Sequence, residues 1–199
     1  MKIFRPSRSL TLALCSALAL PAQGAEITSS IDATALPTYK TTLDGKYLSS
    51  QDVYHMVWEE PAILFIDVRD PVELAQIGHP EKVDANIPIR IQDFDSRAFP
   101  QLGQLSLNPG FLDDMKETLL LNNKSRHDLI ILTCGSGRRS AEAARILSDN
   151  GYTNVWHVPD GYDGDHTVGY NLSNAWKDAG LPWSMELAQS SPWPLKVSY

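Results

Sequence analysis

The sequence predicts an α/β domain with a central, mainly parallel sheet that is covered by helices on both faces. Short apolar runs, typical of buried strands, alternate with segments whose apolar residues recur at helical spacing. Such alternation is typical of parallel sheets, because a helix usually carries the chain back between two parallel strands. One strand–loop–helix unit, residues 129–150, contains a cysteine in its loop and is the most informative stretch of the chain.

The 199 residues divide into four parts. Residues 1–25 combine a basic start, an apolar run and small residues, which predicts a secretory signal peptide and a location in the bacterial periplasm. Residues 26–45 are polar and without period, so we expect a flexible or loosely docked lead-in. The domain itself spans residues 46–168. A Trp-rich extension, residues 169–199, is expected to pack on the domain, and no membrane anchor is expected after signal cleavage.

The elements of the domain follow from local signals. Tyr47-Leu48 predicts a short strand, and a helix capped by Ser49 or Ser50 is expected to end before Pro61. Residues 90–110 contain several Gly, Pro and Asn residues and predict a long connection. Further strands are expected at residues 62–66, 85–89, 129–133 and 153–158, and further helices from Pro71, over residues 111–121 and over residues 140–150.

The composition limits the partners and isolates one thiol. Three of the 17 basic residues lie in the leader, so the mature chain has 14 basic and 24 acidic residues. No basic run remains to bind a phosphate backbone, and nucleic acid is not expected as a partner. Cys15 also leaves with the leader, which makes Cys134 the lone thiol of the mature chain. A lone cysteine in a secreted protein indicates a reactive thiol or an intermolecular bond, rather than inert packing in a glycine-rich loop.

Cys134 lies where a buried strand ends and a helix begins, which is where open parallel sheets bind ligands. The glycines after it allow the backbone to curl so that its N–H groups face inward and bind an anion. The helix N-terminus and the following arginines favour the thiolate, and the same groups would bind an anionic substrate. The candidate loop residues are Gly135, Ser136, Gly137, Arg138 and Arg139. Arg139 is expected to support the loop or bind the anion, whereas Arg138 is either part of the site or merely exposed.

Other residues have supporting or structural interpretations. Asp67 and Arg69 follow a predicted strand and are expected to support the loop from the same sheet edge, with Ser140 at the start of the helix. An acidic group does not match the spacing of an EF-hand loop and predicts a solvated turn: Asp160, Asp163 and Asp165 with His166. One cysteine and scattered histidines predict no zinc site, and no cofactor is expected.

These motifs together resemble the rhodanese family of sulfurtransferases. The matching segments follow the family's order: Ile66-Asp67-Val68-Arg69-Asp70-Pro71-x-Glu73, Gly78-His79 before Asn86-Ile87-Pro88, Cys134-x-x-Gly137-x-Arg139-Ser140, and Asn150-Gly151-Tyr152-x-Asn154-Val155. The resemblance implies a small α/β domain with its catalytic cysteine at Cys134. The sequence departs from the family in a slightly longer Gly78–Pro88 segment, and in Asp160-Gly161 where a glycine pair is more usual.

The resemblance implies transfer of a sulfane sulfur from a donor such as thiosulfate or mercaptopyruvate, through a persulfide on Cys134, to an acceptor such as cyanide or a thiol. A cysteine phosphatase is disfavoured, because four residues separate Cys134 from Arg139 and that class has five. Two alternatives remain. One is a non-catalytic persulfide carrier or anion-binding module that docks on a periplasmic protein through the Trp-rich extension. The other is a redox or thiol-protecting role.

Overall fold

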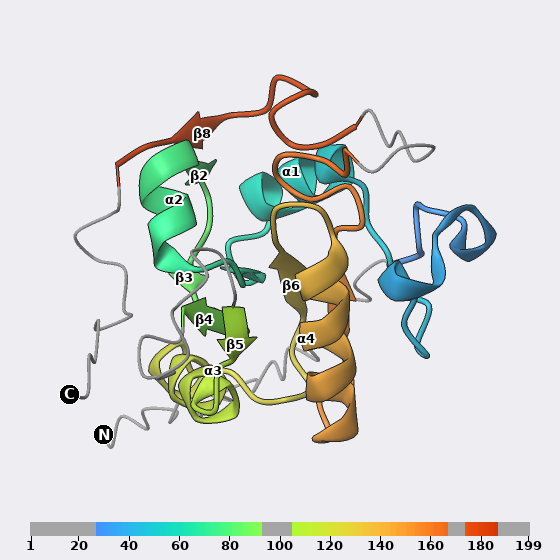
Figure 1. Ribbon diagram of the computed structural model, residues 1–199. Coiled ribbons are helices and arrows are strands. Elements are labelled where there is room, and N and C mark those ends of the chain that lie inside the picture. Colours follow the sequence, from blue (N-terminus) through green and yellow to red (C-terminus); the bar gives the residue numbers. More distant parts are fainter. Residues whose placement is uncertain (1–26, 93–104, 167–173, 187–199) are drawn as a thin grey trace, which may run out of the picture.

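The computed structural model describes residues 27–92, 105–166 and 174–186 (Figure 1). The leader predicted for residues 1–25 lies outside these ranges. The helices are η1 (Ala33–Ala35), η2 (Thr38–Lys40), α1 (Ser50–Glu59), α2 (Pro71–Ile77), α3 (Phe111–Leu121) and α4 (Arg138–Asp149). The strands are β1 (Leu64–Asp67), β2 (His79–Pro80), β3 (Ala85–Asn86), β4 (Arg90–Gln92), β5 (Leu105–Leu107), β6 (Ile130–Thr133), β7 (Val155–His157) and β8 (Trp183–Ser184).

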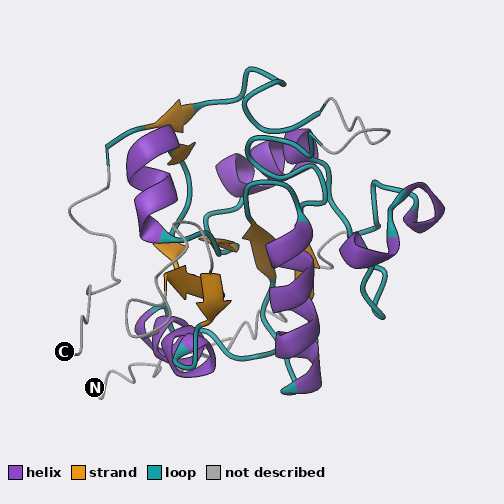
Figure 2. Ribbon diagram, viewed as in Figure 1, coloured by secondary structure: helices purple, strands orange, loops and turns teal. Residues whose placement is uncertain are grey.

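A four-stranded parallel sheet in the order β3-β1-β6-β7 forms the centre of the domain. β6 lies between β1 and β7, and an isolated parallel bridge from Tyr47 to His157 extends the edge beyond β7. The helices surround these strands (Figure 2). The predicted α/β class with a mainly parallel sheet is therefore confirmed.

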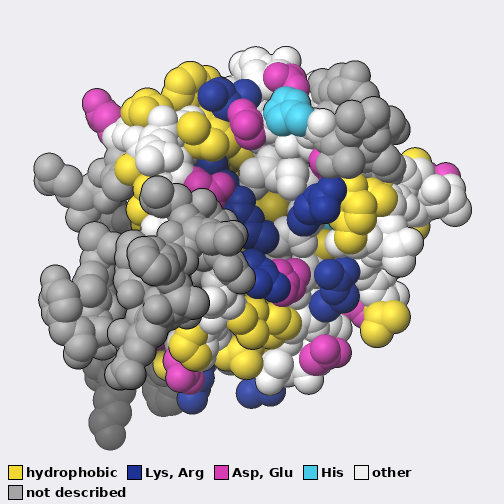
Figure 3. Space-filling view, viewed as in Figure 1, with side chains coloured by type: hydrophobic (Ala, Val, Ile, Leu, Met, Phe, Trp, Pro, Cys, Tyr) yellow, Lys and Arg dark blue, Asp and Glu magenta, His cyan; other side chains and the backbone are white. Residues whose placement is uncertain are grey.

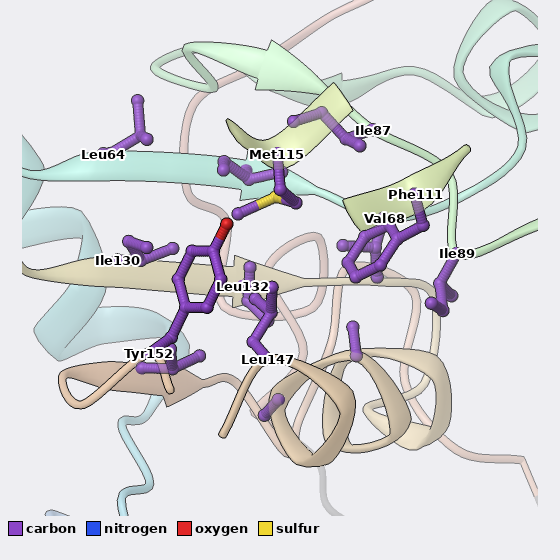
Figure 4. Close-up of a cluster of buried hydrophobic side chains, with 14 of the residues drawn as sticks. Leu64, Val68, Ile87, Ile89, Phe111, Met115, Ile130, Leu132, Leu147 and Tyr152 are labelled. Carbon is purple, nitrogen blue, oxygen red and sulfur yellow. The ribbon is translucent and has the colours of Figure 1, made fainter. Parts of the chain in front are cut away.

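The core has two parts, one on each face of the sheet. On one face, apolar residues of β1 and β6 pack against α3 and α4, with Phe111 and Met115 from α3 and Leu147 from α4 (Figure 4). On the other face, Phe65 and Ile131 pack with residues of α1 and with Trp176. Because both faces are covered, the strands are apolar throughout, as is typical of parallel sheets.

Local capping signals explain where the helices begin. Ser49 caps α1 by accepting from the Asp52 N–H, as predicted. Asp70 and Glu73 form a capping box at α2, and Pro71 occupies its first turn. α3 matches the predicted residues 111–121. α4 begins at Arg138, two residues earlier than predicted, immediately after the left-handed Gly137.

Short strands appear where the sequence predicted irregular chain. Within the connection at residues 90–110, β4 and β5 pair antiparallel. β2, at the predicted helix break, pairs antiparallel with β8 from the C-terminal extension. Of the predicted Trp-rich extension, the structure describes residues 174–186, in which Trp176 is fully buried against Phe65 and Trp183 is 45% exposed; Trp193 lies outside the described residues. Among the described helices, none is both long and apolar enough to cross a bilayer.

The N-terminal segment, residues 27–45, differs from the expected flexible or loosely docked lead-in of residues 26–45. Its η2 lies beside α4, and the side chain of Lys40 is fully buried (Figure 1). Arg145 of α4 donates to the Thr41 carbonyl at 2.7 Å, and Ser148 Oγ lies 3.0 Å from Asp44 Oδ2. These contacts fix the segment to the helix that follows Cys134.

Candidate active site

The cysteine loop, residues 134–137, connects β6 to α4 at the carboxyl end of the sheet. Cys134 is fully buried, and two backbone N–H groups point at its sulfur: the Sγ atom accepts from Gly137 N at 3.1 Å and from Ser140 N at 3.4 Å. Its Sγ also lies 3.6 Å from Ser140 Oγ. Donors in this arrangement favour negative charge on the sulfur, at the N-terminal end of a helix of 12 residues.

Residues 159–164 hold the cysteine loop by close backbone contact. The N–H of Tyr162 donates to the Cys134 carbonyl at 2.7 Å, and the N–H of Asp163 donates to the Gly135 carbonyl at 2.9 Å. Gly137 has a φ of +83°, and a Cβ there would lie 2.1 Å from the Pro159 carbonyl oxygen. This approach requires glycine, so the second glycine of the loop is set by packing as well as by turn geometry.

Asp67 and Arg69 form a fully buried ion pair beside the loop. Nη2 of Arg69 lies 2.6 Å from Asp67 Oδ2 and donates to the Gly78 carbonyl at 2.9 Å. The guanidinium also lies over the ring of Tyr162, 4.4 Å from its centroid. Burial lowers the pKa of Arg69, but the carboxylate of Asp67 outweighs burial and the net shift is upward. Arg69 therefore stays charged, and its charge interacts favourably with an anion at Cys134.

Arg139 is held beside the loop by Glu73, which also takes part in the capping box of α2. It forms a two-point ion pair with Glu73 of α2, with 2.7 Å between Nη2 and Oε1. A Cβ placed on Gly135 would lie 3.4 Å from Nη2 of Arg139. Burial lowers the pKa of Arg139, but the hydrogen bonds to Glu73 and a negative charge at Cys134 raise it overall. Of the two roles expected for Arg139, this geometry favours support of the loop.

Ser140 connects the cysteine to a buried histidine. Ser140 Oγ lies 3.3 Å from Nδ1 of His157, and it donates to the Gly137 carbonyl at 3.2 Å. Burial lowers the pKa of His157 to about 3, so the ring is neutral at physiological pH. His157 was not predicted as a site residue. As a neutral ring without contact to the sulfur, it orients Ser140 rather than serving as a charged partner.

The acidic turn that was predicted to be solvated is buried at two of its positions. Asp160 is 2% exposed and Asp165 is 6% exposed. Asp165 is the partner of Lys40, at 3.2 Å, and burial raises the pKa of Asp160 to about 6. Among the described residues, no group of three or more His, Cys, Asp or Glu side chains is arranged to hold a metal ion.

The structure brings all the predicted site residues to one edge of the sheet. It adds residues that the sequence did not indicate, because their contacts join distant parts of the chain: Tyr39, Lys40, His157 and Asp165. Glu73 carried a signal, since it lies in the matching motif, but its ion pair with Arg139 crosses 66 residues of sequence. On the face viewed in Figure 3, Lys and Arg side chains gather around the start of α4, although the whole chain has a net charge of −7.

Comparison with known proteins agrees with this geometry. A family model for the rhodanese-like domain matches residues 49–166, which is more than half of the chain. The chain belongs to the rhodanese-like domain family. Members of this family are generally sulfurtransferases, and the predicted resemblance is confirmed at this level.

Individual relatives of this rhodanese-like protein have low sequence identity to it. An uncharacterised protein of Rickettsia conorii is 29% identical over 136 residues, which cover 68% of this chain and 94% of that protein. The tRNA uridine(34) hydroxylase of Photorhabdus laumondii is 27% identical over 124 residues, or 62% of this chain and 29% of that enzyme. The crystal structure of Rv0390 from M. tuberculosis has a TM-score of 0.53 at 23% identity, covering 70% of this chain and 97% of Rv0390. The last likeness shows the shared fold.

Proposed function

We propose that this protein is a sulfurtransferase in which Cys134 accepts a sulfane sulfur from thiosulfate and passes it to a thiophilic acceptor such as cyanide or a thiol. The observation that supports this most strongly is the sulfur of Cys134, which accepts hydrogen bonds from Gly137 N and Ser140 N at the start of α4. The charges of Arg69 and Arg139 favour the thiolate at the same place. A thiolate so held is the nucleophile that sulfur transfer needs.

The reaction proceeds in two displacements. The Cys134 thiolate attacks the outer sulfur of thiosulfate, the S–S bond of the donor breaks, and sulfite leaves with the electron pair. The persulfide on Cys134 is then anionic at its outer sulfur, where inward N–H groups of the loop stabilise it. Cyanide attacks that outer sulfur, thiocyanate leaves, and the thiolate is restored. A thiol acceptor would instead take the sulfur as its own persulfide.

The burial of Cys134 decides how a sulfur donor reaches it. The residue is fully buried, whereas Gly135 and Ser136 in front of it in the loop are partly exposed and small. We infer that the outer sulfur of the donor enters past these two residues, while the anionic part of the donor stays outside among the arginines. A small sulfane donor such as thiosulfate fits this requirement, and mercaptopyruvate is the alternative donor.

We propose that this reaction takes place in the periplasm. The sulfur donor and acceptor would be small molecules, and a periplasmic protein is a further candidate partner. The compartment depends on the signal peptide predicted for residues 1–25. The intact mass of the protein isolated from its own cells tests this part. A mass that still includes the leader would contradict it.

Initial rates of thiocyanate formation, with thiosulfate and cyanide both varied, test the proposed reaction. We expect the parallel double-reciprocal lines of a ping-pong mechanism, and a fall of at least about a thousand-fold in kcat for Cys134→Ser. Cys15→Ser is the matched control, because it removes the other cysteine of the full chain and should leave the rates unchanged. Full activity in Cys134→Ser would overturn the proposal.

A further inference from the structure

The N-terminal segment, residues 27–45, contains a buried lysine although the family match begins only at residue 49. Lys40 is the last residue of η2, and its side chain is fully buried. Its Nζ atom lies 3.2 Å from Asp165 Oδ2, and the carboxylate of Asp160 also interacts with it electrostatically. These carboxylates compensate the burial of the ammonium group. The same Nζ atom also donates to the Pro159 carbonyl at 3.0 Å.

The Pro159 carbonyl that Lys40 contacts is one wall of the cysteine loop. A Cβ added to Gly137 would lie 2.1 Å from the Pro159 oxygen, so this oxygen packs directly against the backbone of Gly137. The N–H of Gly137 donates to the sulfur of Cys134 at 3.1 Å. The path from Lys40 to the N–H that faces the sulfur therefore consists of one hydrogen bond and one close backbone contact.

The two halves of the cysteine loop meet the turn of residues 159–164 in different ways. In the first half, the N–H of Tyr162 donates to the Cys134 carbonyl, and two further N–H groups of the turn donate to the Gly135 carbonyl. In the second half, Gly137 meets the turn through the Pro159 carbonyl. A buried carbonyl that loses its donor is destabilised, which favours rotation of its peptide group. Loss of the ammonium group should therefore loosen the second half of the loop more than the first.

The backbone beside Lys40 is fixed to the helix in which the loop ends. Arg145 of α4 donates to the Thr41 carbonyl at 2.7 Å, and η2 lies beside α4 (Figure 1). α4 begins directly after Gly137. Lys40 thus connects α4 with the turn of residues 159–164, and the cysteine loop lies between these two elements. Such a connection restricts the movement of the turn relative to the helix.

We propose that Lys40 is a positioning residue of the cysteine site: it holds the Pro159 carbonyl against Gly137 and so keeps the Gly137 N–H directed at the sulfur of Cys134. This inference rests on the proposed function, because that N–H would stabilise the anionic sulfur of the thiolate and then of the persulfide. It assigns a role in the site to a residue that precedes the matched range. Lys40 acts through Pro159 and Gly137.

The amide proton of Gly137 tests this role in the resting protein, without any sulfur transfer. NMR spectra of the isotope-labelled full chain give its chemical shift and its rate of exchange with deuterium. We expect Lys40→Met to move the proton upfield, as for a weakened hydrogen bond, and to raise its exchange rate about ten-fold. The kcat for thiosulfate and cyanide should fall about five-fold in the same variant. Lys40→Gln, which keeps an N–H donor on a shorter side chain, should give smaller changes.

Two control variants separate positioning from stability and from charge. Leu119→Ala leaves a cavity in the core and should cost at least as much stability as Lys40→Met, in a helix that leads into the end of β6 opposite to Cys134. Lys177→Met removes another cation near the same turn, since its Nζ atom lies 5.6 Å from the centroid of the Tyr162 ring. Both controls should leave the exchange rate of the loop amide within about two-fold of the wild type.

A Gly137 amide that behaves in Lys40→Met as it does in the wild type would overturn the proposal. Equal changes in Leu119→Ala or in Lys177→Met would overturn it as well, because stability or charge alone would then account for them, and so would an altered amide with an unchanged kcat. Failure of the proposed function looks different. A wild-type protein without sulfur transfer would remove the reaction, and the amide would still show whether Lys40 directs it at the sulfur.

Discussion

The two sides of the cysteine loop use charge differently. On the side of β1 and α2, each arginine has a carboxylate of its own: Arg69 pairs with Asp67, and Arg139 pairs with Glu73. On the side of the N-terminal segment, Lys40 and Arg138 share the carboxylate of Asp165, and the carboxylate of Asp160 also interacts with Lys40. One-to-one pairing makes each cation depend on a single carboxylate, and the two charges also interact favourably with an anion at Cys134. Shared pairing gives Asp165 several partners, so the loss of one of them leaves the others in place.

The two sides also differ in where their residues lie in the sequence. Asp67, Arg69, Glu73 and Arg139 fall within residues 49–166, the range of the family match, whereas Tyr39 and Lys40 precede it. The arginines that interact with an anion at Cys134 therefore lie in the matched range, whereas the preceding segment packs against the start of α4. Substitutions on the two sides should therefore have unequal effects on stability.

The largest effect is expected for Asp67→Asn. This change leaves Arg69 fully buried without its carboxylate, and breaking a buried ion pair in this way costs about 3–5 kcal/mol in the free energy of unfolding. Urea denaturation measures it. The exposed Asp113→Asn is the control, expected within about 0.5 kcal/mol of the wild type. A loss below about 1 kcal/mol for Asp67→Asn would mean that this pair does not hold the side of β1 and α2.

A smaller effect is expected for Lys40→Met on the opposite side. Asp165 keeps the Tyr39 hydroxyl and Arg138 as partners, whereas the Pro159 carbonyl loses the Lys40 donor, so the loss should be about 1–3 kcal/mol, the range for a buried group left without its hydrogen bond. The same urea experiment, with the exposed Lys116→Met as control, measures this loss. If Lys40→Met were as costly as Asp67→Asn, the proposed contrast between one-to-one and shared pairing would be wrong.

Local patterns were enough to predict most of the framework. Hydrophobic periodicity and helix capping act within a few residues of the chain. They are enough to predict the strand–loop–helix unit around Cys134, the cap at Ser49 and the helix at residues 111–121. The same signals place Asp67, Arg69 and the cysteine loop at one sheet edge, because carboxyl ends of parallel strands meet there.

Contacts between distant segments were not predictable in this way. Lys40 lies in a polar stretch without period, and its burial depends on a carbonyl 119 residues later. β2 looked like a helix break, because Gly78-His79-Pro80 has no strand pattern and its partner β8 is more than 100 residues away. The burial of Asp160 and Asp165 has the same origin: charged residues in a turn-rich stretch predict solvent exposure unless a partner such as Lys40 arrives from elsewhere.

The central claim, that Cys134 carries sulfur, is tested most directly by the mass of its peptide. The purified protein is treated with thiosulfate without an acceptor, the excess is removed, and the peptide is analysed before and after addition of cyanide or a thiol. We predict a gain of one sulfur atom on Cys134, removed by cyanide with release of an equal amount of thiocyanate and absent in Cys134→Ser. A peptide that gains no mass, or gains mass that a thiol does not remove, as for a sulfinic acid, would contradict the account.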